Sequence, residues 1–407
     1  MTGVQTCALP IFNLLKLRAS WGKTGQDNLG SSLYGSYAPN NFKVNFSDNS
    51  IINIPYVSMG ANYPDVSWQK TTMKNIGLDF YLLSDRISGS FDFFRNDITR
   101  LLGYASTSPL AIYETRPVNG GHYYRRGWEL MLDTKNIVGE FTWDTSLTFS
   151  KTNSFWKERL PNYDYQIYQK RENEPMNAYY YYNVTGIINT DRSNMPESQK
   201  SLQAEAQLPG CPIIEDKNKD GKIDENDIYM KDNSPAVYVG FGNTFTYKNF
   251  EFSFFMYGQF GIQKYNIAYS AAQAGPLAVD YPENSNKFAY RLWNSQTNPN
   301  GSRPGLAIGK MGALPGNAWV NTDMENASFM RMRNITLAYN LTGNLLGSLQ
   351  RYVRNIKVYV DAQNPFILTK FQGFDPEIYT GGGGASGGSR GEYPQTRTFS
   401  LGANITF

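Results

Sequence analysis

The feature that most constrains this chain is an alternation of apolar and polar side chains with a period of two, repeated along its length. The clearest case is Arg397–Phe407, where Phe, Leu, Ala and Ile take one parity and Thr, Ser, Gly and Asn the other. Successive side chains of a strand point to opposite faces, so each such segment predicts a strand with one apolar and one polar face. The same pattern recurs, ten times in all, at Leu15–Thr24, Met73–Leu82, Arg86–Phe94, Gly127–Thr134, Glu140–Ser150, Val237–Tyr247, Phe250–Phe260, Phe329–Asn340, Arg354–Gln363 and Arg397–Phe407.

The connections between these segments alternate in length. Short ones cover residues 83–85, 135–139, 248–249 and 341–353, and long ones cover residues 25–72, 95–126, 151–236, 261–328 and 364–396. A soluble sandwich has no reason to keep every second connection short. A transmembrane β-barrel does, because its periplasmic turns are short and its extracellular loops are long. With Phe407 at the periplasmic rim, every long connection is expected outside the cell.

Composition excludes other classes of protein. The 38 Lys and Arg residues nearly balance the 35 Asp and Glu residues, which gives no concentrated charge for a nucleic-acid partner. The mean hydropathy is −0.48, and the chain has no continuous apolar run of the length that a membrane helix needs. Aromatic residues make up 15% of the chain, and those near strand ends are expected to form interfacial girdles. They are Trp21, Trp128, Trp143, Tyr247 and Tyr339.

The long loops are too large for a small ten-stranded barrel, whereas large outer-membrane transporters have about 22 strands and a plugged lumen. The predicted fold is therefore all-β: the C-terminal ten or so antiparallel strands of a transmembrane barrel of about 22 strands, without the plug domain. Residues 1–12 show no periodicity and are interpreted as a non-native leader, and residues 13–407 as barrel. Leu15–Thr24 and Arg397–Phe407 are expected to be the two edge strands.

One segment has the ligand spacing of a calcium loop. Asp216, Asn218 and Asp220 occupy positions 1, 3 and 5 of an EF-hand-like loop, and Gly221 allows the sharp turn at position 6. The Lys222 carbonyl would serve position 7, Asp224 position 9 and Asp227 position 12. Asp in place of Glu at position 12 shortens the reach and is expected to weaken binding. The predicted role of Ca²⁺ is to stiffen an extracellular loop, and the alternative is a solvated turn that binds nothing.

The remaining candidate sites favour structural roles. Two cysteines, Cys7 and Cys211, cannot form a disulfide framework, and the single histidine, His122, is interpreted as an ordinary loop residue. Asp375 and Glu377 lie two residues apart and are interpreted as loop anchors and not as a glycosidase pair. Outer-loop aromatics can stack on sugars, contact a partner protein or pack the loops themselves. They are Tyr179–Tyr182, Trp156, Trp293 and Trp319.

The glycine-rich run at residues 381–391 lacks the strand-to-helix context and the Lys-Ser/Thr pair of a phosphate loop. It is interpreted as a flexible outer loop.

Several separated stretches resemble the C-terminal part of SusC/RagA-type TonB-dependent outer-membrane transporters. They occur in the expected order and together cover nearly all of residues 13–407. The stretches are Trp68–Phe94, Gly127–Asn136, Asp216–Tyr229, Gly240–Gly261, Phe329–Leu341, Val358–Ile378 and Tyr393–Phe407.

This resemblance implies a part of an energised importer of oligosaccharides or peptides in the cell outer membrane of a Gram-negative bacterium, and not an enzyme. The implied partners are a SusD-like surface lipoprotein that acts as a lid, outer-membrane lipid, and the TonB–ExbB–ExbD complex, which would act through an N-terminal region that this chain lacks. No nucleic-acid partner and no catalytic or cofactor-binding residue is expected. The alternatives are a soluble or surface-exposed, calcium-stiffened glycan-binding adhesin and a glycoside hydrolase.

Overall fold

The computed structural model describes residues 11–26, 37–45, 51–58, 66–106, 115–160, 166–169, 173–265, 289–305, 314–317, 319–373, 375–377 and 395–407. Cys7, most of the predicted leader and the glycine-rich run at residues 381–391 lie outside these residues. No helix in the described part of the chain is long and apolar enough to cross a membrane.

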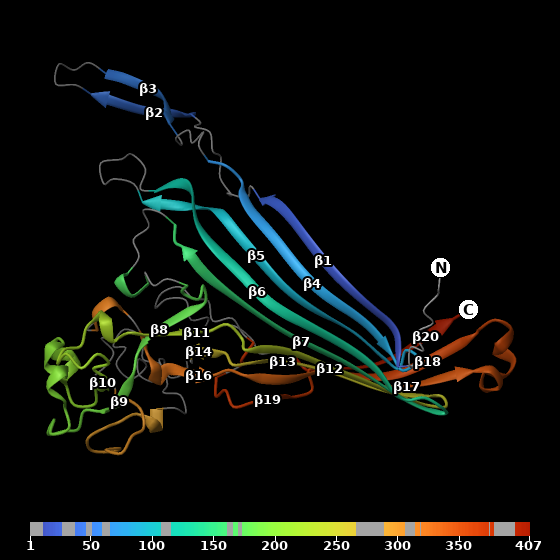
Figure 1. The fold of residues 1–407 in the computed structure, drawn as a ribbon. Helices are drawn as coiled ribbons and strands as arrows, with labels where there is room; N and C mark the ends of the chain where they lie inside the picture. Colours follow the sequence, from blue (N-terminus) through green and yellow to red (C-terminus); the bar gives the residue numbers. More distant parts are fainter. Residues whose placement is uncertain are drawn as a thin grey trace, which may run out of the picture.

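A single antiparallel sheet dominates the structure (Figure 1). Its strand order follows the sequence, β1–β4–β5–β6–β7–β12–β13–β17–β18–β20, and the short strand β19 (Ile367–Thr369) pairs with β17 beside this order. All ten predicted strands are present, and the predicted edge strands are the two ends of this order. Their bounds are β1 Phe12–Gln26, β4 Gln69–Leu82, β5 Ile87–Ser106, β6 Thr115–Ile137, β7 Phe141–Glu158, β12 Val237–Tyr247, β13 Phe250–Phe260, β17 Phe329–Thr342, β18 Asn355–Gln363 and β20 Thr398–Thr406.

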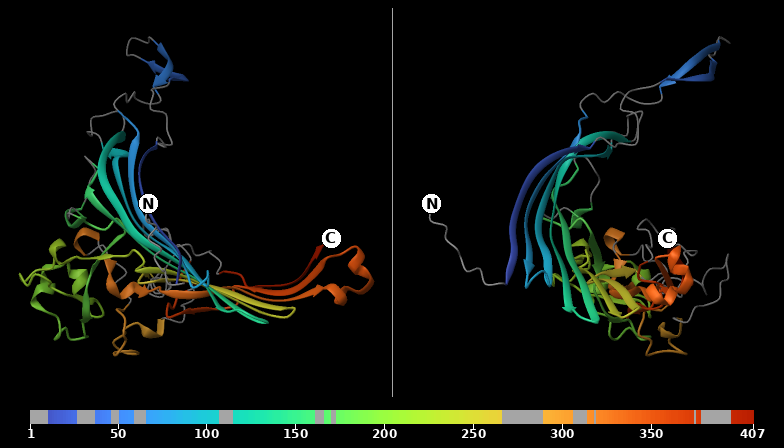
Figure 2. Two further views of the ribbon diagram at one scale, coloured as in Figure 1. Left: turned by 45° about the vertical axis from the view of Figure 1, so that its right-hand side comes forward. Right: turned by 90° about the vertical axis from the view of Figure 1, so that its right-hand side faces the viewer.

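The sheet is one curved layer (Figure 2). Its two faces differ, one being apolar and the other polar. The register aligns the apolar positions across strands, as in the row that joins Leu17 to Leu78, Phe91 and Leu130. On this face Leu17 is 74% exposed, Phe399 75% and Leu401 77%, and no second sheet among the described residues covers these side chains. A sandwich would bury them between its layers. The structure therefore contradicts the soluble-sandwich alternative.

Aromatic rings gather on the apolar face at the end where the short connections lie. Trp143 stacks on Phe245 at 5.7 Å between ring centroids, and Phe250 meets Tyr339 edge-on at 4.7 Å. Asn243 lies buried among these rings and accepts hydrogen bonds from Trp143 Nε1 at 2.7 Å and from the Thr145 hydroxyl at 2.8 Å. Three of the residues predicted for a girdle, Trp143, Tyr247 and Tyr339, lie at this end, whereas Trp21 and Trp128 lie further along β1 and β6, toward the long connections.

Three strands are longer than the alternation indicates. β5, β6 and β7 continue beyond the predicted ends into residues expected to be loop, and β5 stays paired with β6 as far as Ser106 and Thr115. The interpretation of His122 as a loop residue is therefore wrong, because it lies within β6 opposite Thr99. These extensions mix charged residues such as Arg95 with apolar ones such as Leu101 and Leu102 and do not keep a strict alternation, so the sequence pattern did not reveal them.

The long connections form structure of their own at the other end of the sheet. β2 (Tyr37–Asn45) and β3 (Ile51–Ser58) make a hairpin that projects away from it (Figure 1). The larger body, called here the loop body, is built on β8 (Ala178–Tyr182), β9 (Val184–Ile187), β10 (Pro212–Ile214), β11 (Tyr229–Asp232) and β15 (Trp319–Val320). Smaller elements complete this end: β14 (Gln263–Tyr265), β16 (Met324–Asn326), β19 (Ile367–Thr369), and 3-10 turns at Ile167–Gln169, Glu197–Ser201, Ala204–Gln207, Glu225–Asp227, Ala289–Arg291, Pro315–Asn317 and Asn321–Asp323. A further 3-10 segment, Gly343–Arg351, lies in the connection between β17 and β18.

The loop body has its own apolar core. Tyr182 and Ile228 are fully buried, and they pack with Tyr168, Ile214 and Val320 from separate stretches of the chain. The Tyr182 hydroxyl donates to the carbonyls of Asp224 and Pro315 at 3.0 and 3.1 Å. Burial, with the nearby charge of Asp227, raises the pKa of Tyr182. The hydroxyl therefore stays protonated and remains a donor.

A buried ion cluster ties another long connection to the sheet. Arg331 on β17 is 3% exposed and donates to both oxygens of Asp375 at 2.7 Å and to Glu377. The Tyr257 hydroxyl on β13 donates to the same Glu377 carboxylate. The prediction that Asp375 and Glu377 are loop anchors is confirmed, because both carboxylates are occupied by one guanidinium.

The first prediction tests this anchor. Arg331→Gln leaves two carboxylates buried without their cation, and removal of one partner of a buried ion cluster costs about 3–5 kcal/mol. We expect a matching fall in the free energy of unfolding, measured by urea titration in detergent micelles, and faster tryptic cleavage after Lys370. The matched control is Arg333→Gln, because the exposed Arg333 guanidinium has an uncharged partner, Asn364 Oδ1 at 3.0 Å, and its loss leaves no buried carboxylate without a cation. A hydrogen bond with one charged group contributes about 1.5–3 kcal/mol, so the control is expected to cost less than Arg331→Gln. Equal effects of the two variants would contradict the anchoring role.

Candidate functional site

The polar face of the sheet carries charged clusters that the alternation places there. Arg18 on β1 donates to Asp79 on β4 at 2.8 and 2.9 Å and to Asp92 on β5 at 2.9 Å. Gly77 lies between these side chains, and a Cβ at this position would collide with the Asp92 carboxylate and the Arg18 guanidinium. On the same face, Lys357 donates to both oxygens of Glu251 at 2.9 and 3.0 Å. These half-exposed ion pairs are typical of a wet interior surface.

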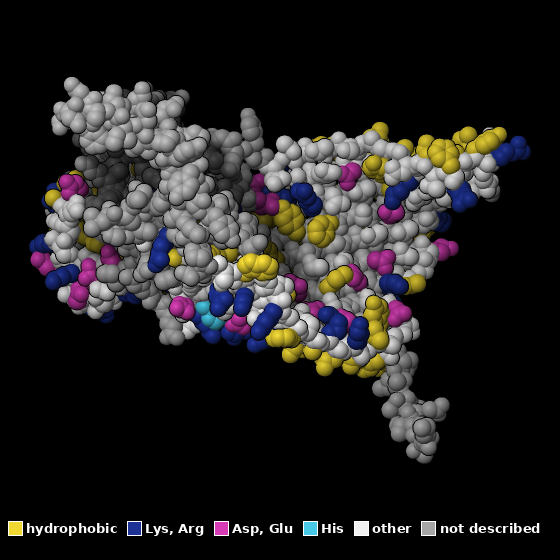
Figure 3. Space-filling view, turned by 90° about the horizontal axis from the view of Figure 1, so that it is seen from above, with side chains coloured by type: hydrophobic (Ala, Val, Ile, Leu, Met, Phe, Trp, Pro, Cys, Tyr) yellow, Lys and Arg dark blue, Asp and Glu magenta, His cyan; other side chains and the backbone are white. Residues whose placement is uncertain are grey.

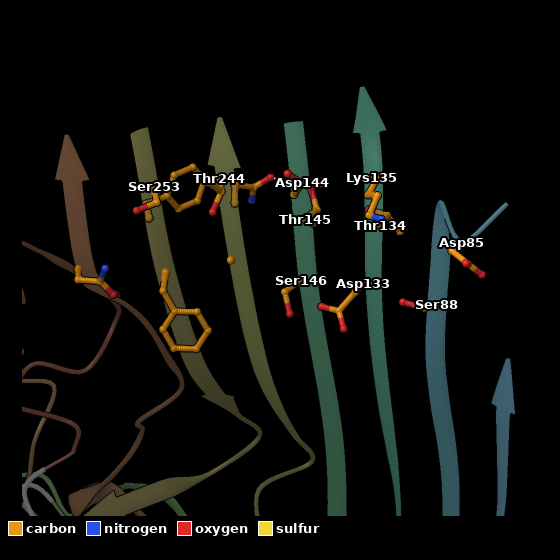
Figure 4. Close-up of a pocket in the computed structure, with 15 residues that line it drawn as sticks. Asp85, Ser88, Asp133, Thr134, Lys135, Asp144, Thr145, Ser146, Thr244 and Ser253 are labelled. Carbon is orange, nitrogen blue, oxygen red and sulfur yellow. Dashed lines mark hydrogen bonds between the residues drawn. The ribbon is translucent and has the colours of Figure 1, made fainter. Parts of the chain in front are cut away.

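A cavity of about 380 Å³ lies on this polar face near the short turns (Figure 4). Ser88, Asp133 and Ser146 come from three neighbouring strands and turn toward one another along its floor. Lys135 and Asp144 lie at its margin, and Phe255 adds an apolar wall. Hydroxyl, carboxylate and ammonium groups can hold water or a polar solute at this cavity.

The EF-hand-like loop lies in the loop body, between β10 and β11. Asp216 accepts from the backbone N–H groups of Asp220 and Gly221 at 3.2 and 2.9 Å, and Gly221 has the positive φ of 85° that the turn requires. Asn218 Oδ1 accepts from Asp220 N–H at 3.1 Å, and Asp220 accepts from Lys222 N–H at 2.9 Å. Positions 1, 3 and 5 of the predicted site therefore meet at one turn.

The far end of the predicted site is differently placed. Asp227 is fully buried, and its two oxygens accept from the backbone N–H groups of Lys217 and Asp224 at 2.9 and 2.8 Å. Asp224 caps the short Glu225–Asp227 turn. Within the described ranges, no group of three or more His, Cys, Asp and Glu side chains is gathered closely enough to hold a metal ion. The loop thus has the calcium-loop turn, while Asp227 serves to close the loop.

The outer-loop aromatics divide into two sets. Tyr182 belongs to the core of the loop body, and Tyr180 packs against it. Tyr179, Tyr181 and Tyr229 form a half-buried stack with centroid distances of 5.3 and 5.8 Å. The prediction that Trp156 lies in an outer loop is wrong, because it lies in β7, where it contacts Tyr123 of β6. Trp293 lies against Gly210. The side chain of Trp319 lies outside the described residues. Most of these rings therefore pack the loops themselves.

Sequence reasoning did not identify the Arg18 cluster or Arg331. Both are single charged residues on strands, and their partners lie 44 to 74 residues away in the chain. The sequence places Arg18 at a polar-face position, which is compatible with an ion pair. Its partner Asp79 can be identified only when the pairing of β1 with β4 is known.

Comparison with known proteins identifies relatives along nearly the whole chain. No family model matches it. The TonB-dependent receptor SusC of Bacteroides thetaiotaomicron is 29% identical over 412 residues, which cover 97% of this chain and 37% of the relative. The TonB-dependent receptor P3 of Formosa agariphila is 26% identical over 413 residues, which cover 96% of this chain and 39% of the relative. The chain thus spans about two fifths of the length of these relatives.

Solved structures agree on the fold. The RagAB peptide importer in its closed-closed state superposes with a TM-score of 0.72 at 19% identity, over 98% of this chain and 41% of the importer chain. A second structure, of the RagAB peptide transporter, gives a TM-score of 0.70 at 20% identity over 97% of this chain. At this identity the likeness concerns the fold, and the matched part is the one-layer sheet with its large loops.

The relatives are outer-membrane receptors of a transporter family and not enzymes, in agreement with a sheet whose one face is apolar and exposed. The chain is a homologue of the SusC/RagA-type TonB-dependent receptors of the outer membrane and matches about two fifths of their length.

Proposed function

We propose that this chain forms part of the barrel wall of a TonB-dependent importer of oligosaccharides or peptides. The observation that carries the proposal is the contrast between the two faces of one sheet: exposed Leu and Phe on one side, and ion pairs and a polar cavity on the other. A sheet in hydrocarbon must satisfy its backbone hydrogen bonds strand to strand, so the apolar face would meet lipid and the polar face the lumen. The remaining strands and the plug would come from the rest of a longer protein.

We also infer a SusD-like surface lipoprotein as partner and a TonB–ExbB–ExbD link through the rest of the longer protein. Support for a lid partner comes from the loop body, which has its own core at the long-loop end and therefore presents a defined surface. The RagAB complex offers a parallel, since its structures describe a peptide importer. Oligosaccharide and peptide remain the two classes of cargo.

The second prediction tests the membrane-facing side. Phe91 lies on the apolar face of β5, in the apolar part of the strand that precedes Arg95, and Ser90 beside it lies on the polar face. Lysine on the lipid face at the bilayer midplane costs about 2–4 kcal/mol. We therefore expect Phe91→Lys to reduce the folding free energy in phosphatidylcholine vesicles by this amount, and the matched Ser90→Lys variant to change it much less.

The measurement is a urea titration of the chain folded in vesicles. The folded fraction is read from gel electrophoresis, in which folded barrel protein migrates differently before and after heating. Equal costs for the two substitutions, or a compact monomer that purifies without detergent, would favour the adhesin alternative and overturn the proposal.

We further propose that the Asp216–Asp227 loop binds Ca²⁺. In support, Asp216, Asn218 and Asp220 meet at a turn of the EF-hand type. The Lys222 carbonyl and water would complete the ligand set, with Asp224 at position 9 and Asp227 as the structural closure of the loop. Bound Ca²⁺ would stiffen the loop body without taking part in chemistry.

The third prediction follows from this proposal. Because extracellular modules bind Ca²⁺ at about 10⁻⁴–10⁻³ M, millimolar Ca²⁺ is expected to raise the resistance of the loop body to proteolysis, and EDTA to reverse the effect. Asp220→Ala should abolish this response. Asp191→Ala is the control, since Asp191 also accepts a backbone N–H in a turn of the same body, from Ser193 at 3.1 Å, but lies outside the loop. If Ca²⁺ does not change the cleavage rate of the unsubstituted chain, the calcium site is refuted.

A further inference from the structure

The apolar face of the sheet ends, toward the long loops, in a group of cations. The register aligns Trp21, Lys74, Arg95 and Arg126 in one row across β1, β4, β5 and β6. Two residues closer to the long loops, a second row on the same face begins with Lys23 on β1. Two residues closer to the short turns, a third row contains Ile76, Phe93 and Trp128 and ends with Lys151 on β7. Residues paired across an antiparallel sheet share a face, so all these cations lie on the outward side. We call Lys23, Lys74, Arg95, Arg126 and Lys151 the outer basic belt.

The outer basic belt has little compensating charge. Asp97 is the one described carboxylate on these three rows, and it already pairs with Arg95 at 3.0 Å and lies 3.6 Å from His122 Nε2. For Lys23, Lys74, Arg126 and Lys151 the described part of the chain provides no ion pair. Arg126 rests over the Phe155 ring at 5.3 Å, and Lys23 over the Trp21 ring at 5.4 Å.

Like charges directly opposite one another destabilise a sheet. Lys74 pairs with Arg95, and Arg95 pairs with Arg126, so three cations occupy three adjacent strands about 4.8 Å apart. Asp97 neutralises Arg95 alone, so a further anion between Lys74 and Arg126 would relieve the remaining repulsion in this row. Guanidinium and ammonium groups at this spacing can grip a phosphate from several strands at once, and the planar guanidinium fork matches phosphate oxygens.

The position of the belt identifies the source of the anion. Directly below it, on the same face, lie the exposed apolar residues Ile76 and Phe93, and Trp21 and Trp128 stand at the boundary. Trp at such a boundary marks the level of lipid headgroups. Figure 3 shows Lys and Arg side chains running beside the hydrophobic margin of the sheet. Charge complementarity and continuity with the lipid-facing surface both point to headgroups and not to cargo in the lumen.

We propose that the outer basic belt binds the phosphate groups of anionic lipids in the outer leaflet, and so fixes the height of this part of the barrel wall in the membrane. This inference rests on the proposed function, because it requires the apolar face to meet lipid. A phosphorylated glycolipid such as lipid A is the fitting class of ligand. The phosphate would sit between Lys74, Arg95 and Arg126, while the acyl chains run along the apolar rows below.

The fourth prediction compares two charge-matched double variants. Lys74→Gln with Arg126→Gln removes two belt cations that have no described ion pair. Lys16→Gln with Arg125→Gln removes one Lys and one Arg from the polar face, where Lys16 lies opposite Asp79 and Arg125 opposite Asn96. Each variant of the whole chain is titrated in neutral detergent micelles with bisphosphorylated lipid A, with the same lipid after removal of its phosphates, and with inorganic phosphate alone.

We expect the belt variant to bind bisphosphorylated lipid A at least tenfold more weakly than the unsubstituted chain, and the polar-face variant to bind it normally. Binding should weaken with salt, as expected for exposed charges. If both variants bind lipid A with equal affinity, or if the chain binds both lipids equally, the proposal that the outer basic belt binds phosphate is overturned. The proposal that the apolar face meets lipid is not affected by these outcomes. Binding of inorganic phosphate as tight as that of the lipid would show a free-anion site. A chain that takes up neither lipid would overturn the proposed function as well.

Discussion

The structure depends on one constraint: the backbone N–H and C=O groups of a strand that crosses hydrocarbon can be satisfied only by neighbouring strands. Sequential antiparallel pairing from β1 to β20 meets this requirement, and each strand then has to present one face to lipid and one to water. Leu17, Phe399 and Leu401 therefore lie exposed without any covering layer, which would be costly in water and is favourable in a bilayer. The same requirement keeps the short connections short, since a turn at the membrane edge has little room.

The long connections obey different physics. They lie outside hydrocarbon, and so they can fold as small soluble units with ordinary cores. Tyr182, Ile214 and Ile228 form such a core, and Arg331 fastens a further connection through Asp375 and Glu377. The body at this end is therefore both ordered and attached, as a surface that meets cargo or a partner needs to be. The calcium proposal fits this arrangement, because a cation at the Gly221 turn would stiffen a loop whose Ile223 already anchors it in the core.

Charge on the wall follows its two environments. On the polar face, Arg18 pairs with Asp79 and Asp92, and Lys357 pairs with Glu251, so the charges there are neutralised within the chain. On the outward side the cations Lys74 and Arg126 lack a described carboxylate, and they stand at the boundary of the apolar belt. The polar face therefore neutralises its charges within the chain, whereas the outer basic belt has cations that a ligand could neutralise.

The sequence by itself determined the ten principal strands of the large sheet, their order and their two faces. A period of two and the alternation of loop lengths are local properties that the bilayer imposes on each segment in turn. It also identified Asp375 and Glu377 as anchors and the turn at Gly221. Only the tertiary structure decided which side chains meet across strands: Arg331 with its carboxylates, the Arg18 cluster, and the row from Lys74 to Arg126. It also showed that His122 lies in a strand, because β5 and β6 continue beyond the apolar belt where no lipid enforces a pattern. Contacts of this kind depend on register and on partners distant in the chain, and a one-dimensional pattern does not contain them.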